Sequence, residues 1–468
     1  MFFQHIFESS LAHSSYLIGC QAKGVAIVID PKRDVDTYLA IANKNNLKIT
    51  HIAETHIHAD YLSGTLELAE LTGAQCYLSD EGGQDWQYEF PHIGLKDGDQ
   101  IHVGNLIFNV IHTPGHTPES ISLSLIDTPA TMEPVMIFTG DFVFVGDVGR
   151  PDLLENAAGL IGTKEIGAHQ MFGSLKQFLA LPDHIQVWPA HGAGSACGKA
   201  LGAVPSTTVG YERIRNWALQ YKDNEKAFVQ ELLDGQPEPP RYFAMMKKLN
   251  KITRPLQTAV PQYTKLTKDE FIKHYKAGTA TIDTRHKFDF AKGYLPNSIN
   301  IQNNKTFNTW AGWVLNYTEP FILILDETEL DDITRKLMRI GLDQVVGYIT
   351  PEMVSQLGIP LERQQLIDFD EMNRAVGNPN AQILDVRNTT EFTAGHLPGA
   401  THLFVGTIAD NLDKIDRERK LYLHCQSGDR ATIAASILAK YGIKDIKIYS
   451  PSINDWVAKG GGLVKSSF

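Results

Sequence analysis

The sequence has few cysteines and no long apolar run. Four cysteines in 468 residues are too few and too scattered for a disulfide framework, which favours a reducing compartment. No stretch of 18 apolar residues occurs, so we expect no segment that spans a membrane. The N-terminal apolar stretch contains His, Glu and Ser and follows no basic region, so it lacks the pattern of a signal peptide. We therefore expect a cytoplasmic protein.

Basic residues are also in the minority. The chain has 43 Lys and Arg against 54 Asp and Glu, a formal net charge of −11. It has no basic stripe, which argues against nucleic acid or an anionic membrane as the main partner. The length is sufficient for about two to four domains, each with its own core.

Histidine and aspartate side chains follow a predicted strand early in the chain. Residues 48–53 form an apolar run typical of a buried strand, and the motif THIHAD occupies residues 55–60. If the strand continues, His56, His58 and Asp60 share one of its faces, because side chains alternate along a strand. Imidazole and carboxylate groups are donors that borderline and hard divalent cations prefer. The motif predicts a metal site; the alternative is a polar loop with two hydrogen-bonded histidines.

Three later motifs present the same kinds of side chain. His116 lies in a turn rich in Pro and Gly, within HTPGHTP. Asp141 and His191 each follow an apolar strand, at residues 136–138 and from residue 187. Loops at the ends of strands are where a rigid sheet places functional groups. We therefore expect these side chains to meet those of the first motif.

The series THIHAD, HTPGHT, TGD and PAHG, in this order, resembles the metallo-β-lactamase fold over about the first 250 residues. The resemblance implies an αβ/βα sandwich. Hydrolases of that family, such as glyoxalase II, carry a second-metal His where this chain has Tyr61, and a phenol with a pKa of about 10 is a poor zinc ligand. What remains is His56, His116 and Asp141, the donor set of non-haem Fe(II) oxygenases.

The branch of the family that this departure resembles is the persulfide dioxygenases, which oxidise a thiol-bound sulfane sulfur to sulfite. The resemblance implies one Fe(II) per chain, held by His56, His116 and Asp141. The neighbouring His58, Asp60 and His191 are then expected to orient the ligands or to hydrogen-bond the substrate.

Two further residues are candidates for substrate binding. The resemblance places a substrate-contacting Arg at Arg150, where a guanidinium can clamp a carboxylate; the alternative is a surface Arg in a turn. Cys197 lies in the glycine-rich loop after His191 and can line the pocket. Its alternative is a buried small hydrophobe, the usual role of a lone cysteine.

Local patterns predict the elements around these motifs. Strands are expected at residues 15–19, 25–30, 74–78, 100–103 and 106–112, and helices at residues 34–42, 64–71 and 242–249, with Asp34 as the cap of the first helix. Pro-containing segments near residues 254 and 261 indicate a linker over residues 251–262.

The rest of the chain contains an internal repeat. IDTR at residues 282–285 matches LDVR at 384–387, and AKGYLPNS at 291–298 matches TAGHLPGA at 393–400. Each copy then has an apolar strand, at residues 321–325 and 420–424, which implies a small parallel α/β domain occurring twice. These motifs resemble the rhodanese family over residues 263–468. We expect an inactive copy at residues 263–360 and an active one at 361–468.

The two copies differ at the reactive position. In the second, the strand leads to the cysteine loop, which comprises Cys425, Gln426, Ser427, Gly428, Asp429 and Arg430, and then to a helix expected at residues 431–441. A helix N-terminus favours a thiolate, and the loop amides can cradle a persulfide or sulfonate. Four residues separate the Cys from the Arg, one fewer than in the related phosphatases, which favours sulfur over phosphate. The first copy has acids and no thiol at residues 325–329, so we expect a spacer or docking surface.

The resemblance therefore implies a persulfide dioxygenase joined to a rhodanese, which converts a small-molecule thiol persulfide, O2 and sulfite into thiosulfate for sulfide detoxification. Glutathione, coenzyme A, bacillithiol and cysteine all remain open as the thiol. We also expect a homo-oligomer, either a dimer or a tetramer. Two alternatives remain: a zinc thioester hydrolase of the glyoxalase II type, and a sulfur carrier whose first domain only binds.

Overall fold

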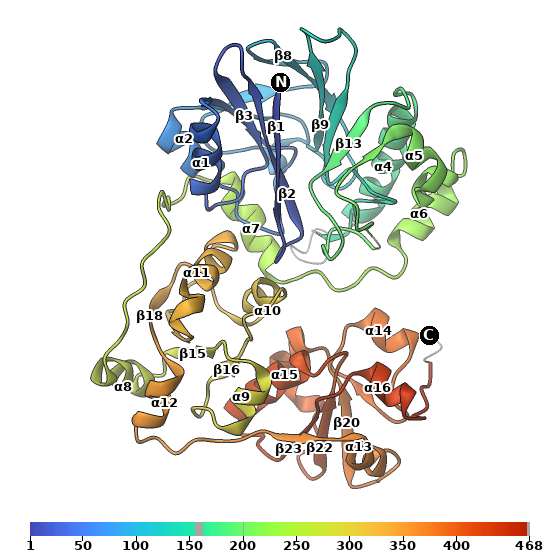
Figure 1. Cartoon of the computed structure of the whole chain (residues 1–468). Coiled ribbons are helices and arrows are strands. Elements are labelled where there is room, and N and C mark those ends of the chain that lie inside the picture. Colours follow the sequence, from blue (N-terminus) through green and yellow to red (C-terminus); the bar gives the residue numbers. More distant parts are fainter. Residues whose placement is uncertain (154, 156–161, 200, 466–468) are drawn as a thin grey trace. The chain divides into compact units, whose positions relative to one another are not determined.

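The computed structural model describes residues 1–153, 155, 162–199 and 201–465, and these form two compact units (Figure 1). The first unit comprises Met1–Pro261 and Arg335–Gly341, and the second comprises Gln262–Thr334 and Leu342–Phe468. Both repeated segments lie in the second unit, and the finer boundaries expected from the sequence stay predictions. Within the described ranges, no helix is long and apolar enough to cross a membrane.

The first sheet of the first unit has six strands in sequence order. They are β1 (Phe2–Glu8), β2 (His13–Cys20), β3 (Val25–Ile29), β4 (Lys48–Ala53), β5 (Gln75–Ser79) and β6 (Ile93–Leu95). From β3 to β6 the strands pair in parallel, and a parallel pair needs a crossover. The helices α1 (Asp36–Lys44) and α2 (Thr65–Thr72) supply two of these crossovers, and Leu17, Tyr38 and Ile52 are buried beside them.

The second sheet has the strand order β14-β13-β10-β9-β8-β7. Its strands are β7 (Gln100–Val103), β8 (Leu106–His112), β9 (Ile121–Asp127), β10 (Met136–Gly140), β13 (Gln186–Pro189) and β14 (Thr207–Thr208), and a short hairpin joins β11 (Val143–Phe144) to β12 (Asp147–Val148). Tyr16, Phe108 and Phe138 belong to one buried cluster that joins the two sheets.

Helices cover the outer faces of both sheets in the first unit (Figure 1). On the second sheet these are α4 (Thr163–Leu179), α5 (Val209–Arg215) and α6 (Glu225–Leu233), whose apolar residues Phe172 and Phe228 pack in a cluster with Val187 of β13. The helix α7 (Tyr242–Lys251) precedes the end of this segment at Pro261. The expected αβ/βα sandwich is confirmed.

Two local expectations are wrong. The helix expected from Asp34 begins at Asp36, because the Asp34 carboxylate accepts from Arg339 instead of capping the helix. The motif THIHAD does not continue the strand: β4 ends at Ala53, and residues 54–64, the metal loop, are irregular apart from an isolated bridge at Ser63. His56 and His58 therefore do not share a strand face.

The second unit contains two parallel sheets, one for each repeat. The first is β16-β15-β17-β18, with β15 (Ala280–Asp283), β16 (Ile299–Asn300), β17 (Phe321–Ile324) and β18 (Val345–Ile349). The second is β19-β23-β22-β20-β21, with β19 (Gln365–Ile367), β20 (Ala381–Asp385), β21 (Thr401–His402), β22 (Lys420–His424) and β23 (Ile446–Tyr449). The helices of this part of the chain are α8 (Lys268–Lys276), α9 (Lys287–Lys292), α10 (Phe307–Val314), α11 (Leu330–Arg339), α12 (Pro351–Gln356), α13 (Phe369–Ala375), α14 (Thr389–Ala394), α15 (Asp429–Lys440) and α16 (Ile453–Ala458). The second half of α11, from Arg335, belongs to the first unit.

The repeated motif DxR has the same geometry in both copies. Arg285 Nη2 donates to Asp283 Oδ2 at 2.6 Å and to the Gly293 carbonyl at 3.0 Å. In the second copy, Arg387 donates to Asp385 Oδ2 at 2.6 Å and to the carbonyl of Gly395 at 2.7 Å. The motif thus ties the end of one strand to the end of the following helix, which explains why it recurs.

Candidate metal centre and cysteine loop

Three buried side chains of the first unit come together as the sequence predicts. The ligand atoms of His56, His116 and Asp141 all lie within 4.8 Å of one another. His116 Nε2 is 3.4 Å from Asp141 Oδ2, and His56 Nε2 is 3.9 Å from the same oxygen. These residues follow β4, β8 and β10, so three strand ends of the two sheets converge on one site.

Strand β10 and the metal loop approach each other closely at this site. Gly140 has φ +54, and a Cβ there would lie 2.3 Å from Thr55 Oγ1. The hydroxyl and amide of Thr55 both donate to the Asp30 carboxylate, at 2.9 and 2.7 Å. Because β10 can come this close to the metal loop, Asp141 reaches His56.

Each histidine ring has its second nitrogen engaged. His56 Nδ1 is 3.1 Å from Thr55 Oγ1, and His116 Nδ1 is 2.9 Å from the Arg150 carbonyl oxygen. Such contacts fix a ring so that Nε2 points to a metal. Burial lowers the pKa of both rings, and a metal ligand must be a neutral imidazole.

The donor atoms that face one another fit a cation. Within the described part of the chain, His56 Nε2 and both Asp141 oxygens have no hydrogen-bond partner, although they are buried. Burying polar atoms without a partner costs about 1–3 kcal/mol each, unless an ion satisfies them. The set therefore suits a divalent ion with two imidazoles and one carboxylate.

A second buried group adjoins the first. Asp60, His191 and Cys197 also place their ligand atoms within 4.8 Å of one another. His191 Nε2 lies 3.2 Å from Asp60 Oδ2 and 3.4 Å from Asp141 Oδ1, so Asp141 stands beside both groups. Burial raises the pKa of the Cys197 thiol above its usual range. The expected substrate contact of Cys197 stays a prediction.

His58 and Tyr61 both contact Asp30. His58 Nε2 lies 3.1 Å from Asp30 Oδ1; burial opposes a charge on this ring, but Asp30 raises its pKa to about 9. The Tyr61 hydroxyl donates to the Asp30 carbonyl at 3.3 Å, and burial raises the pKa of this phenol well above its usual range. Both side chains therefore interact with Asp30.

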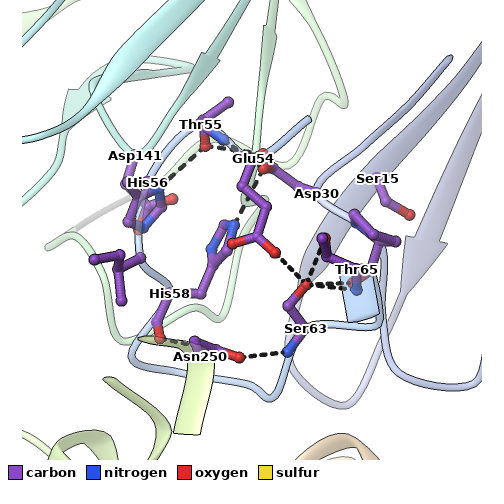
Figure 2. Close-up of polar contacts among 12 residues, drawn as sticks. Ser15, Asp30, Glu54, Thr55, His56, His58, Ser63, Thr65, Asp141 and Asn250 are labelled. Atoms are coloured by element: carbon purple, nitrogen blue, oxygen red, sulfur yellow. Dashed lines mark hydrogen bonds and ion pairs between the residues drawn. The ribbon is translucent and has the colours of Figure 1, made fainter. Parts of the chain in front are cut away.

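Residues missed from the sequence hold the metal loop. Asn250 of α7 donates to the carbonyl oxygen of His58 at 2.8 Å (Figure 2). The same amide donates to the carbonyl oxygen of Tyr61 at 2.9 Å. Glu119 is buried and accepts from the Ile57 amide at 2.8 Å; burial raises its pKa to about 7. Neither residue belongs to a recognisable motif.

Arg150 is fully buried, so the alternative of a surface Arg is wrong. Its Nε and Nη2 donate to the Asp152 carboxylate at 2.8 and 2.5 Å, and Nη2 also donates to the Pro237 carbonyl at 2.7 Å. Its backbone carbonyl accepts from His116. A substrate clamp at Arg150 stays a prediction.

A cavity of about 280 Å³ opens beside the first group of ligands. Its lining includes Trp86, Gly115, His116, Pro118, Pro151 and Ile166. A mostly apolar hollow with one ligand histidine in its wall is typical of a small-molecule site. Trp86 was not predicted, because an isolated Trp carries no sequence signal.

The cysteine loop of the second unit is a second candidate site. Cys425 follows β22 and is buried, and the Gly428 amide lies 3.1 Å from its sulfur. Gly428 has φ +87, and a Cβ there would lie 2.6 Å from the Ser450 carbonyl oxygen. The glycine thus lets the loop turn into α15 with an N–H directed at the sulfur.

Charged groups surround this loop. Both Nη atoms of Arg430 donate to the Glu391 carboxylate, at 2.5 and 2.7 Å. Beneath the loop, burial lowers the pKa of His424 to about 4, although Asp385 lies only 3.5 Å away. Glu391 was not predicted, because only the fold brings α14 to the loop.

Comparison with known proteins agrees with this architecture. The metallo-beta-lactamase superfamily model matches residues 10–191, and the rhodanese-like domain model matches residues 368–459. The crystal structure of a metallo-beta-lactamase from Staphylococcus aureus is 42% identical, covers 75% of this chain and 99% of that chain, and gives a TM-score of 0.68.

Two curated relatives cover part of the first unit. The hydroxyacylglutathione hydrolase of Rhodospirillum rubrum is 33% identical over 38% of this chain and 60% of its own length. The persulfide dioxygenase ETHE1 of Bos taurus is 28% identical over 40% of this chain and 67% of its own length. The chain belongs to the metallo-β-lactamase superfamily and carries a C-terminal rhodanese-like domain.

Proposed function

We propose that this protein is an iron-dependent persulfide dioxygenase joined to a thiosulfate-forming sulfurtransferase. One observation carries the first half: the ligand atoms of His56, His116 and Asp141 lie within 4.8 Å of one another. Among the described residues, His56 Nε2 and both Asp141 oxygens have no hydrogen-bond partner, whereas His58 and Tyr61 contact Asp30. Two imidazoles and one carboxylate would hold the ion and leave positions open for substrate and O2.

The residues of the first unit would hold Fe(II) through His56 Nε2, His116 Nε2 and the Asp141 carboxylate. When bound, the ion supplies the Lewis acidity and the one-electron chemistry that O2 requires. The cavity beside His116 admits the thiol carrier, and its apolar wall excludes water from the sulfur. Asp60 and His191, which lie 3.2 Å apart, provide further polar groups, and His191 lies 3.4 Å from Asp141.

The cysteine loop performs the sulfur transfer. The Cys425 thiolate attacks the outer sulfur of a persulfide; the S–S bond breaks, and its electron pair leaves on the carrier thiolate. Sulfite then attacks the same outer sulfur through its lone pair. The new S–S bond completes thiosulfate, and the broken bond returns its electron pair to Cys425. The Gly428 N–H, 3.1 Å from the sulfur, stabilises each anionic form.

A zinc thioester hydrolase is the second candidate, and one observation favours it. Asp141 stands beside the second buried group of Asp60, His191 and Cys197, an arrangement that suits two ions sharing a carboxylate. The similarity to a hydroxyacylglutathione hydrolase agrees with this candidate. It predicts thioester hydrolysis without O2.

An oxygen electrode separates the two candidates. We expect O2 uptake with the persulfide of glutathione, coenzyme A, bacillithiol or cysteine, and formation of sulfite. His116→Ala should abolish the O2 uptake. The control variant His184→Ala, at an exposed position, should leave it unchanged. Hydrolysis of S-lactoylglutathione with no O2 uptake on any of the four persulfides would contradict the proposal. The cytoplasmic location and the oligomeric state stay predictions.

A further inference from the structure

The copy without a cysteine reaches the cysteine loop. Lys287 is the first residue of α9 in the first copy, and it is buried. Its Nζ donates to the Ser427 carbonyl oxygen, and to Asp429 Oδ1 at 2.7 Å. Both acceptors belong to the loop that carries Cys425.

A second residue of the same copy completes this contact. Asn304 Nδ2 donates to Asp429 Oδ2 at 3.2 Å, so residues of the first copy hold both oxygens of this carboxylate. Lys287 is itself fixed, because its backbone N–H donates to Gln302 Oε1 at 3.0 Å. Its ammonium nitrogen would lie 3.2 Å from a Cβ at Gly428, whose N–H lies next to the Cys425 sulfur.

The charges at the loop explain why this contact matters. Asp429 opens α15, where the helix dipole favours an acid, but its charge repels an anionic sulfur donor or acceptor. Arg430 cannot offset this charge alone, because it is paired with Glu391. With Lys287 in place, the two acids at the loop, Asp429 and Glu391, are each paired with a cation. Without Lys287, the negative charge of Asp429 remains on the loop that carries Cys425.

We propose that Lys287 is a positioning residue of the cysteine loop: it holds the backbone from Ser427 to Asp429 and neutralises Asp429, so that the loop accepts sulfur anions. This inference rests on the proposed sulfurtransferase function. It gives the copy without a cysteine a role in the active site of its neighbour, where the sequence suggests only a spacer or docking surface.

The test uses thiosulfate as the donor and cyanide as the acceptor, with the full-length protein. Cys425 takes the outer sulfur and releases sulfite with the electron pair of the broken bond; cyanide then takes this sulfur as thiocyanate and regenerates the thiolate. For Lys287→Gln we expect the KM for thiosulfate to rise about five- to tenfold, because an unpaired charge now repels the dianion. The kcat should change by less than about twofold, and added salt should narrow the difference in KM.

Three variants make the result specific. Lys292→Gln on the same helix, where the side chain is 75% exposed and pairs with Asp289, should leave KM unchanged. Lys287→Arg should restore most of the affinity. Lys287→Gln combined with Asp429→Asn should bring KM back towards the wild-type value, because both charges are gone.

Several outcomes would overturn the inference. An unchanged KM in Lys287→Gln would do so, and so would a double variant with a KM no better than that of Lys287→Gln. Persulfide-dependent O2 uptake by the same preparations shows that the first unit is folded, and far-ultraviolet circular dichroism checks the second. If the wild-type protein itself shows no Cys425-dependent sulfur transfer, the proposed function fails. If the wild-type protein transfers sulfur and Lys287→Gln has the same KM for thiosulfate, only the inference fails.

Discussion

Replacing Asn250 tests how the metal loop is held. Its two donations to the carbonyl oxygens of His58 and Tyr61 are 2.8 and 2.9 Å long. Its Oδ1 also accepts from the Ser63 amide at 2.9 Å, and the side chain is buried. In Asn250→Ala the Ser63 N–H is left buried without this acceptor, which costs about 1–3 kcal/mol, and two lost donations add about 1 kcal/mol.

The expected loss is therefore about 2–4 kcal/mol for the first unit. At about 2–4 °C per kcal/mol for a unit of this size, the Tm of its unfolding transition should fall by about 4–16 °C. Because the loop carries His56, we also expect metal affinity to fall about tenfold. Differential scanning calorimetry and metal titration measure the two effects, with Asn43→Ala at an exposed position of α1 in the same unit as the control. If both variants lose the same small amount, Asn250 does not hold the loop.

Three other predictions address separate sites. Cys425→Ser should still consume O2 and persulfide but release sulfite instead of thiosulfate. His56→Ala should take up no O2 but still transfer sulfur from persulfide to added sulfite. Formation of thiosulfate by Cys425→Ser at the wild-type rate, above a control with matched sulfite and no enzyme, would contradict this division. Arg150→Ala should raise the KM for persulfide far more than it lowers kcat, because the lost charged hydrogen bond contributes about 1.5–3 kcal/mol of binding free energy. An unchanged KM with a lower Tm would mean that Arg150 only holds Asp152. His424 has a pKa of about 4 in the folded protein and about 6.5 in the unfolded chain, so the unfolded chain binds a proton first as the pH falls. The contribution of neutral His424 to the free energy of unfolding is therefore complete above pH 6.5 and falls by about 3 kcal/mol towards pH 4. Urea denaturation at pH 7 and pH 4.5 measures this loss, and His424→Gln should show less of it.

Local patterns were sufficient to single out the candidate metal ligands and the cysteine loop. His116, Asp141 and Cys425 each follow an apolar strand, and the end of a strand is set by residues close in sequence. The repeat was also readable, because the DxR motif makes its own hydrogen bonds within a few residues. In these cases sequence neighbours are also neighbours in space.

Contacts between distant residues explain the errors. The strand expected through His56 and His58 does not form, because Asp30 hydrogen-bonds the Thr55 amide and hydroxyl and lies 3.1 Å from the His58 ring. Side-chain bonds of this kind compete with a strand ladder. The helix expected from Asp34 starts later because Arg339, 305 residues further on, takes the carboxylate.

Contacts between distant residues also explain why the sequence did not predict the residues that support the two sites. Asn250 is 192 residues from His58, and Lys287 is 142 residues from Asp429. Neither lies in a motif, and Lys287 belongs to the copy that has no cysteine at the position of Cys425. Only the packing of the two copies in one unit shows that it touches the reactive loop.

The metal content tests the central claim most directly. Protein purified without oxygen should contain one iron per chain by elemental analysis, and His116→Ala should lose it. The same iron-loaded preparation should consume O2 when a thiol persulfide is added. Two zinc ions per chain, shared through Asp141 with Asp60, His191 and Cys197, would contradict the account and favour the hydrolase.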